Sequence, residues 1–262
     1  MNGKGNITGT VLGAGVMTLI IVCLCVSAGV SRAKRAVTLC TDTEIRIADS
    51  SENKFVCRED IAGYISAGYG RTEGIPIGDI DLKKIESVLD SQSAVLKSEA
   101  YCTKDGTLHV DISQRVPVMR FQKGAASFYA DADGYVFPLK DGKSSHVIVI
   151  DGYIPLKTAG SGKGQAVSGR EREWIERMTD MVLYMEKHKV WDRNIVQIHV
   201  QQNGDLILIP REGKEKFIFG KPSGIEEKFR LMESYYTGIV PAMGKDRYRS
   251  VDVRYRGQII CK

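Results

Sequence analysis

The sequence predicts an α+β protein in three parts: a single N-terminal transmembrane helix, a small βααββ unit, and a mixed β-sheet unit with two helices. Three observations lead to this fold class. Residues 5–31 contain no charged side chain, residues 36–116 follow a strand–helix–helix–strand–strand pattern, and residues 117–262 hold many short alternating runs between turn signals. With 262 residues, 43% of them hydrophobic and 26% charged, the chain is globular and long enough for two modest domains.

The N-terminal apolar block has the length of a membrane span. Residues 11–30 are almost all apolar, and a helix of about twenty residues rises about 30 Å, the thickness of a bilayer's hydrocarbon core. We therefore expect a short cytoplasmic tail over residues 1–10 and a transmembrane helix over residues 11–31. The alternative is a cleaved signal peptide with Val26 and Ala28 at the cleavage site, but the apolar stretch is longer than a usual signal core.

The charges that flank this block indicate on which side of the membrane the C-terminal part lies, and they account for most of the net charge. Lys4 precedes the block, whereas Arg32, Lys34 and Arg35 follow it. A count of lysines and arginines would place the large C-terminal part in the cytoplasm. These four residues account for most of the net charge of +5, so the rest of the chain is nearly neutral. Generic binding to nucleic acid is therefore not expected.

The first unit, over residues 36–116, is expected to pack two helices on a three-stranded sheet. Alternation predicts a strand over 37–48, and apolar residues at helical spacing predict helices over 57–66 and 81–90. Two further strands, 94–102 and 107–116, flank a turn signal at Lys104-Asp105-Gly106.

The second unit, over residues 117–262, is richer in strands. Ser168 with Glu171 and Ser223 with Glu226 are capping-box patterns, and each is expected to begin a helix. Asn203-Gly204 is a hairpin signal. The expected strands cover a pair within 127–139, then 146–150, 194–200, 205–209, 216–220 and 247–262.

Residues that could carry catalysis are scattered. The four histidines are far apart in the sequence: His109, His146, His188 and His199. No HExxH, GxSxG, SxxK or GxGxxG pattern occurs. We expect no catalytic, cofactor or metal site, although a spatial cluster can form without a motif.

The cysteines do not settle the compartment. Cys23 and Cys25 lie within the expected span, and the others have no CxxC or metal-ligand spacing: Cys40, Cys57, Cys102 and Cys261. A disulfide among Cys40, Cys57 and Cys102 and buried free thiols both fit this pattern.

The C-terminal segment is the clearest feature that could bind a partner. Residues 245–262 hold six lysines or arginines against two aspartates, and Val251, Val253 and Tyr255 alternate with polar residues. A basic alternating strand at a sheet edge can accept a partner's strand, with its charges selecting an acidic partner. The same charges can instead keep the edge from aggregating. The residues by themselves leave both interpretations open.

Three motifs, in this order along the chain, resemble the FtsQ/DivIB family of bacterial cell-division proteins, especially those of Bacteroides-type Gram-negatives. Val110–Val118 (VDISQRVPV) resembles the family's strand that ends in (Glu or Arg)-x-Pro-Val. Phe128–Pro138 (FYADADGYVFP) is similar to its Tyr-x-Val-Asp-x-x-Gly-x-Val-Phe hairpin, and Val251–Tyr255 (VDVRY) to its closing Val-Asp-Leu-Arg-Tyr. The βααββ unit before them resembles a POTRA domain.

The resemblance implies a non-enzymatic scaffold anchored in the inner membrane by one helix, with a POTRA-like domain over 36–116 and an FtsQ-type β domain over 117–262 in the periplasm. Family members act at the septum at midcell, bind the bitopic proteins FtsB and FtsL, and help control septal peptidoglycan synthesis. FtsB adds a strand to the edge of the β domain's last strand. The partner-binding residues expected from the motif and from the charge count are Arg247, Arg249, Val251, Asp252, Val253, Arg254, Tyr255 and Arg256.

The resemblance also bears on topology and on the rival classes. It favours a periplasmic C-terminal part, against the count of flanking charges. POTRA surfaces of the family contact other divisome members, although no residue here locates that contact. An outer-membrane POTRA protein would need a long barrel region, for which the chain has no room. The remaining alternatives are an anchored periplasmic binding domain of unknown partner and an anchored periplasmic hydrolase.

Overall fold

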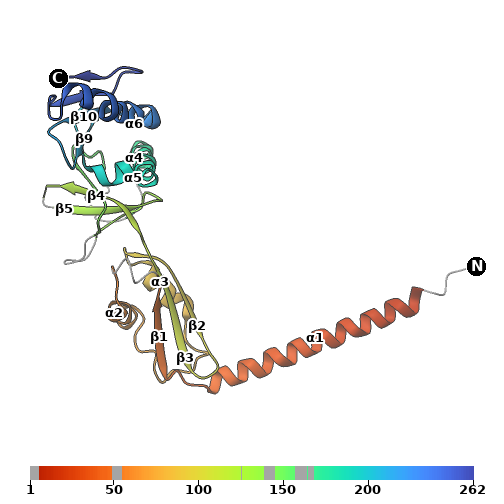
Figure 1. Cartoon of the computed structure of the whole chain (residues 1–262). Helices are drawn as coiled ribbons and strands as arrows, with labels where there is room; N and C mark the ends of the chain where they lie inside the picture. The colour runs from red at the N-terminus through yellow and green to blue at the C-terminus, as the bar shows by residue number, and fades with distance from the viewer. Residues whose placement is uncertain (1–5, 49–54, 125, 139–144, 157–163, 165–167) are drawn as a thin grey trace, which may run out of the picture. The chain divides into compact units, whose positions relative to one another are not determined.

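The computed structural model describes residues 6–48, 55–124, 126–138, 145–156, 164 and 168–262, with the side chains of 6–12 and 14 excepted. The chain is α+β and divides into two compact units. The first comprises residues 1–49 and 56–113, and the second comprises 50–55 and 114–262. Figure 1 shows the N-terminal helix, the first sheet with its helices, and the larger C-terminal unit.

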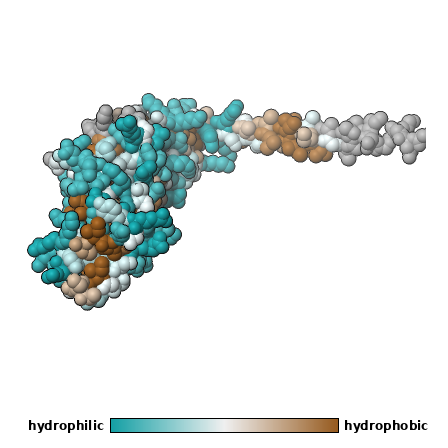
Figure 2. Space-filling model, turned by 90° about the horizontal axis from the view of Figure 1, so that it is seen from above, coloured by the Kyte–Doolittle hydropathy of each residue, from teal (hydrophilic) through white to brown (hydrophobic). Residues whose placement is uncertain are grey.

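The N-terminal helix α1 runs from Asn6 to Val37 and contains a segment, Gly15–Val37, that is long and apolar enough to cross a membrane. None of that segment is buried against the rest of the chain, and Figure 2 shows the hydrophobic band along it. Lys34 and Arg35 lie in its last turn. Such a helix fits a single-pass anchor or a signal sequence.

The first unit has the expected βααββ order. It contains β1 (Asp42–Ile47), α2 (Arg58–Gly68), α3 (Leu82–Asp90), β2 (Val95–Cys102) and β3 (Thr107–Gln114), with strand order β1–β3–β2. The predicted start of the first strand at residue 37 is wrong, because α1 continues to Val37. Residues 38–40 then pair with the loop around Ile75 through Cys40 N–H to Ile75 O (2.8 Å) and Ile77 N–H to Thr38 O (2.9 Å).

Helical spacing correctly identified the buried face of this unit. Ile61 of α2 and Ile85 and Leu89 of α3 are fully buried, and they pack with Leu108 and Val110 of β3. Both helices begin at a capped residue. Asp81 Oδ1 accepts the Lys84 N–H at 3.0 Å, and Asp60 Oδ2 accepts the Cys57 N–H at 3.1 Å.

All six cysteines are free thiols in this structure. Cys40 is buried in the core of the first unit, and Cys102 packs against the same core. Burial raises the pKa of both thiols above the ordinary value.

The second unit is built on a nine-stranded mixed sheet of order β12–β11–β10–β9–β8–β7–β4–β5–β6. Its strands are β4 (Pro117–Lys123), β5 (Ala126–Asp131), β6 (Val136–Phe137), β7 (Ile148–Gly152), β8 (Ile195–Val200), β9 (Leu206–Pro210), β10 (Lys216–Gly220), β11 (Ser250–Asp252) and β12 (Ile260–Cys261). The alternation of apolar and polar residues did not predict β4 as a separate strand.

Helices cover one face of this sheet. They are α4 (Gly169–Lys187), α5 (Lys189–Asn194), α6 (Ile225–Ser234), the π-helix η2 (Tyr235–Ile239) and α7 (Val240–Met243). Met178 and Met181 of α4 and Phe229 of α6 are buried in one core with Phe121, Ile198 and other sheet residues. The aromatic and methionine stripe of α4 therefore belongs to the core.

The two predicted helix starts differ in outcome. Ser168 caps α4 as expected, because its Oγ accepts the Glu171 N–H at 3.2 Å. The expected cap at Ser223 is wrong. Gly224 takes that position with φ of +62°, a left-handed conformation that glycine adopts without strain. The Asn203-Gly204 turn joins β8 to β9 as predicted, with Gly204 at φ of +77°.

Candidate partner-binding edge

The C-terminal strands form one edge of the nine-stranded sheet. β11 pairs in parallel with β10, through Val251 opposite Phe217, and antiparallel with β12, through Val251 opposite Cys261. The expectation that the strand around Val251 has an unpaired edge is therefore wrong. β12 covers that edge and is itself the outermost strand.

A turn that the sequence pattern did not predict explains why the edge of β11 is covered. Residues 247–262 do not form one strand, because the chain reverses after β11. The Gln258 N–H donates to Tyr255 O at 3.2 Å, and Gly257 adopts φ of +65°. Gly257, which follows the alternating residues 251–256, was the available signal for this hairpin.

The hydrogen bonds between β11 and β12 determine which main-chain groups of β12 are free. Ser250 N–H donates to Lys262 O (3.0 Å), and Lys262 N–H donates to Ser250 O (2.9 Å). In an antiparallel pair, alternate residues direct their N–H and C=O groups toward the neighbouring strand. Ile260 and Lys262 therefore face β11, whereas Cys261 directs its main-chain groups outward.

Three of the eight predicted partner-binding residues are interior. Val251 and Val253 are fully buried in the core cluster of the second unit, and Asp252 is 8% exposed. The Val253 N–H also donates to Ile218 O of β10 at 3.1 Å. These residues hold β11 in the sheet and cannot contact a partner through their side chains.

Arg254 is held by carboxylates of its own chain. Its Nη2 lies 2.7 Å from Asp252 Oδ2, its Nε 3.0 Å from Asp252 Oδ1, and its Nη1 3.3 Å from Asp205 Oδ2. Burial by itself would raise the pKa of Asp252, but hydrogen bonds from the Arg254 side chain and backbone lower it below its ordinary value. Bonding to Asp252 raises the pKa of Arg254 further, so the pair stays ionised.

The other four predicted residues are exposed near this edge: Arg247, Arg249, Tyr255 and Arg256. The side chains of Arg247 and Arg249 make no hydrogen bond or ion pair within the described part of the chain. Arg256 is loosely placed, with its Nε 3.7 Å from Glu227 Oε1 and its side chain 92% exposed. The surface beside β12 is therefore cationic and largely free of internal partners.

A second group of signature residues serves the fold rather than the edge. Arg115, ahead of β4, donates from Nη1 to Asp131 Oδ2 at 2.6 Å, and its guanidinium lies 3.6 Å from the centre of the Tyr135 ring. Asp131 Oδ1 accepts the N–H groups of Asp133 and Tyr135, which closes the turn between β5 and β6. The Arg-x-Pro-Val and Asp-x-x-Gly-x-Val-Phe motifs thus meet in one buried ion pair.

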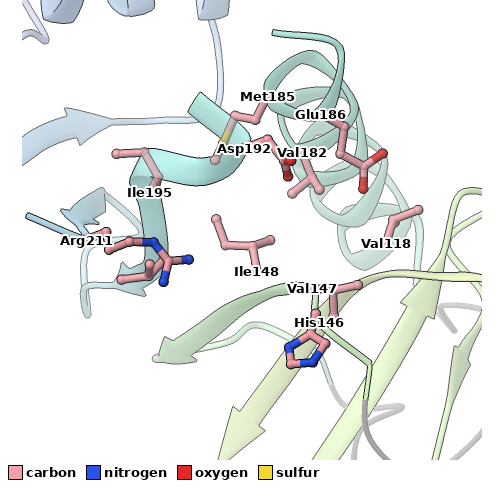
Figure 3. A pocket seen from close by; sticks show the side chains of 11 residues that line it. Val118, His146, Val147, Ile148, Val182, Met185, Glu186, Asp192, Ile195 and Arg211 are labelled. Carbon is pink, nitrogen blue, oxygen red and sulfur yellow. The ribbon is translucent and has the colours of Figure 1, made fainter. Parts of the chain in front are cut away.

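A cavity of about 170 Å³ bears on the hydrolase alternative. Figure 3 shows Glu186 and Asp192 on its helical wall, His146 and Arg211 on other sides, and apolar residues such as Val118 and Ile148 between them. Burial, followed by the charge of Asp192, raises the pKa of Glu186. No hydrogen bond joins these four side chains to one another, and a nucleophile–base pair is not formed there among the residues described.

Candidate metal ligands do not cluster either. Over the ranges that the structure covers, no group of three or more histidine, cysteine, aspartate or glutamate side chains could hold a metal ion.

These features define a class: an α+β protein with an apolar N-terminal helix, a POTRA-like unit, and a mixed sheet whose outermost strand on the C-terminal side, among the described residues, is β12. Residues 38–113 match the model of the POTRA-like domain, and residues 116–262 match the model described as FtsQ/DivIB, C-terminal related. The chain therefore belongs to the FtsQ/DivIB-related family. A search among curated proteins returned no match. The family is generally non-catalytic, and its domains suggest a cell-division protein with divisome partners.

Proposed function

We propose that this protein is a non-enzymatic divisome scaffold that binds bitopic partners of the FtsB and FtsL type and helps to control septal peptidoglycan synthesis. The partner adds a strand to the outer edge of β12. The observation that carries this proposal is the outward-facing main chain of Cys261 on β12, the outermost strand of the described sheet.

The predicted partner-binding residues divide into two groups under this proposal. Arg247, Arg249 and Arg256 supply positive charge, and Tyr255 supplies an exposed aromatic ring beside the edge. The others act indirectly, because they fix β11 and so the position of β12: Val251, Asp252, Val253 and Arg254.

The available edge is short, so the contact depends on more than main-chain hydrogen bonds. The one outward-facing residue of β12 offers up to about two hydrogen bonds, each contributing about 0.5–1.5 kcal/mol net. The entropy lost on association offsets a comparable amount. Side-chain contacts and co-anchoring in one membrane must supply the rest, because anchoring raises the effective concentration. We expect micromolar affinity for a soluble partner ectodomain and tighter binding when both proteins share a membrane.

The test is a titration of the full chain, in nanodiscs, with the ectodomain of the FtsB-type protein from the same organism. Cys261→Pro removes an outward-facing N–H, and its ring blocks an approaching strand. Cys261→Ala is the matched control, because it shortens the same side chain and keeps that N–H. We expect Cys261→Pro to weaken binding about tenfold or more relative to Cys261→Ala, which corresponds to about 1.4 kcal/mol.

Equal affinity of the two Cys261 variants would rule out strand addition at β12. Proline at residue 253 is unsuitable for this test, because the Val253 N–H bonds to Ile218 O inside the sheet and its loss would destabilise the unit itself. Replacing Arg247 and Arg249 together by glutamine should weaken binding and reduce its dependence on salt, since both are exposed charges.

The same proposal covers domain organisation and location. The chain divides into a cytoplasmic tail (1–10), a span (11–31), a POTRA-like domain (36–116) and a β domain (117–262), with both domains in the periplasm. Other divisome members contact the POTRA-like domain, where a groove of about 500 Å³ runs between β1 and α2. A fluorescent fusion should concentrate at midcell in dividing cells; a uniform envelope signal would instead favour an anchored binding domain with another role.

A further inference from the structure

A second cavity lies in the β domain, between the β9–β10 turn and the π-helix η2. It has a volume of about 240 Å³. Ligand pockets for drug-sized molecules usually hold roughly 300–1,000 Å³, so this cavity suits a single side chain. Its walls combine Pro210, Val240 and two tyrosine rings with the carboxylates of Glu212, Glu215 and Asp246.

Glu215 is the central feature of this cavity. It is only 5% exposed, and the Tyr236 hydroxyl donates to its Oε1 at 2.8 Å. No lysine, arginine or histidine nitrogen among the described residues lies within 4.0 Å of its carboxylate. A buried carboxylate without a cation is costly, so this group favours a positively charged ligand.

The tyrosines strengthen this preference. Tyr235 and Tyr236 both line the cavity, and their rings meet edge to face at 5.3 Å. Burial raises the pKa of Tyr235 to about 12 and also raises that of Tyr236, whose hydroxyl hydrogen-bonds to Glu215, so both remain neutral at pH 7. Neutral aromatic faces attract ammonium and guanidinium groups.

The charged residues that line the cavity also favour a positively charged ligand. Three carboxylates and one lysine line the cavity. That lysine, Lys245, lies at the rim, because its side chain is 70% exposed and its Nζ is 3.9 Å from Glu212, whose side chain is 82% exposed. The cavity thus carries the opposite sign to the arginine-rich surface beside β12.

We propose that this tyrosine-lined pocket binds a lysine or arginine side chain of a partner polypeptide, with the cationic group at Glu215. The long side chain reaches the deep carboxylate while its methylenes contact Tyr235 and Val240. A polypeptide is the favoured carrier because the cavity opens at the end of the sheet where β10 and β11 begin and where the antiparallel β12 ends. That choice of carrier rests on the proposed function, whereas the preference for a cation does not.

The test uses the full chain in nonionic detergent and two tripeptides, acetyl-Ala-Lys-Ala-amide and its norleucine analogue. Trp191 reports occupancy through its fluorescence, since its ring centre lies 6.5 Å from that of Tyr236. We expect saturable, millimolar binding of the lysine peptide and at least tenfold weaker binding of the norleucine peptide. Because this comparison uses the unaltered protein, it does not depend on any variant folding.

Glu215→Gln keeps the hydrogen-bond acceptor for Tyr236 and removes the charge, so it should weaken binding of the lysine peptide at least tenfold. Glu186→Gln, in the other cavity, should leave its affinity unchanged. Equal binding of the two peptides, an unaffected Glu215→Gln variant, or no saturable binding of the lysine peptide would each overturn the proposal. Loss of FtsB-type binding with an intact lysine-peptide response would count against the proposed function alone.

Discussion

The buried ion pair between Arg115 and Asp131 makes the sharpest stability prediction. Their side chains are 13% and 7% exposed, respectively, so solvent screens the pair little. Methionine is unbranched like arginine but carries no charge. Replacing Arg115 by methionine therefore leaves the Asp131 carboxylate buried without its cation. It also removes the guanidinium that lies 3.6 Å from the Tyr135 ring centre.

The expected loss in the free energy of unfolding follows from the burial of the ion pair. Breaking a buried ion pair by removing one partner costs about 3–5 kcal/mol, and the lost cation–π contact adds roughly 0.5–2 kcal/mol. We expect Arg115→Met to lower the free energy of unfolding of the β domain by at least about 3 kcal/mol. With a urea m-value of about 2 kcal/mol/M for a domain of this size, the midpoint should fall by roughly 1.5 M.

Tryptophan fluorescence reports this transition selectively. The chain has 2 tryptophans, Trp174 and Trp191, and both lie in helices of the second unit. Urea denaturation of the full chain in mild detergent, followed at these residues, therefore measures the β domain and not the POTRA-like domain.

An exposed ion pair in the same unit is the matched control. Arg177 Nη2 lies 2.6 Å from Glu173 Oε1 on α4, but the two side chains are 49% and 61% exposed. Arg177→Met should cost no more than about 0.5 kcal/mol. If Arg115→Met costs as little as Arg177→Met, the argument from burial is refuted. Combining Arg115→Met with Asp131→Asn should cost less than the sum of the two single changes, by roughly 1–3 kcal/mol.

Two further predictions concern pH. Because the pKa of Glu186 is raised above its ordinary value of 4.5, its ionisation destabilises the folded state as pH rises through that region. Glu186→Gln should therefore raise stability at pH 7 by a few tenths of a kcal/mol, allowing for solvent screening, and not at pH 4; an equal or lower urea midpoint at pH 7 would contradict this. The pKa of Asp252 is lowered from 3.8, so its stabilising effect is complete above that value and is lost as pH falls below it. Asp252→Asn should cost roughly 1–2 kcal/mol at pH 7 and flatten the acid limb of the stability curve; an unchanged acid limb would show that the bond to Arg254 contributes nothing.

Local patterns predicted much of this fold because their causes are local. Ile85 and Leu89 recur at helical spacing, and the Asn203-Gly204 turn needs only two residues to reverse the chain. The cap at Ser168 is equally short-range. Ser223 belongs to the same sequence pattern, but the predicted cap there is wrong, because Gly224 adopts a left-handed conformation and takes the capping position.

The candidate edge was predicted only in part, because pairing between strands is not a local property. Alternation in residues 251–256 indicated a strand, but not which strand would lie outside it. β12 has only two residues, too few for a periodic pattern, and only its pairing with Val251 and Asp252 defines it as a strand. The pocket around Glu215 had no signal in the sequence at all, since its walls come from Asn194 and from the segments 210–215 and 235–246.

The amino-acid sequence alone determined the apolar N-terminal helix, the βααββ order of the first unit, and the family signature, because each depends on residues close together in the chain or on their order along it. Only the tertiary structure decided which strand edge remains open, that Val251 and Val253 are interior, and that Glu215 is buried beside two tyrosines. These depend on contacts between distant segments, whose free energy is settled by packing and strand pairing across the whole domain.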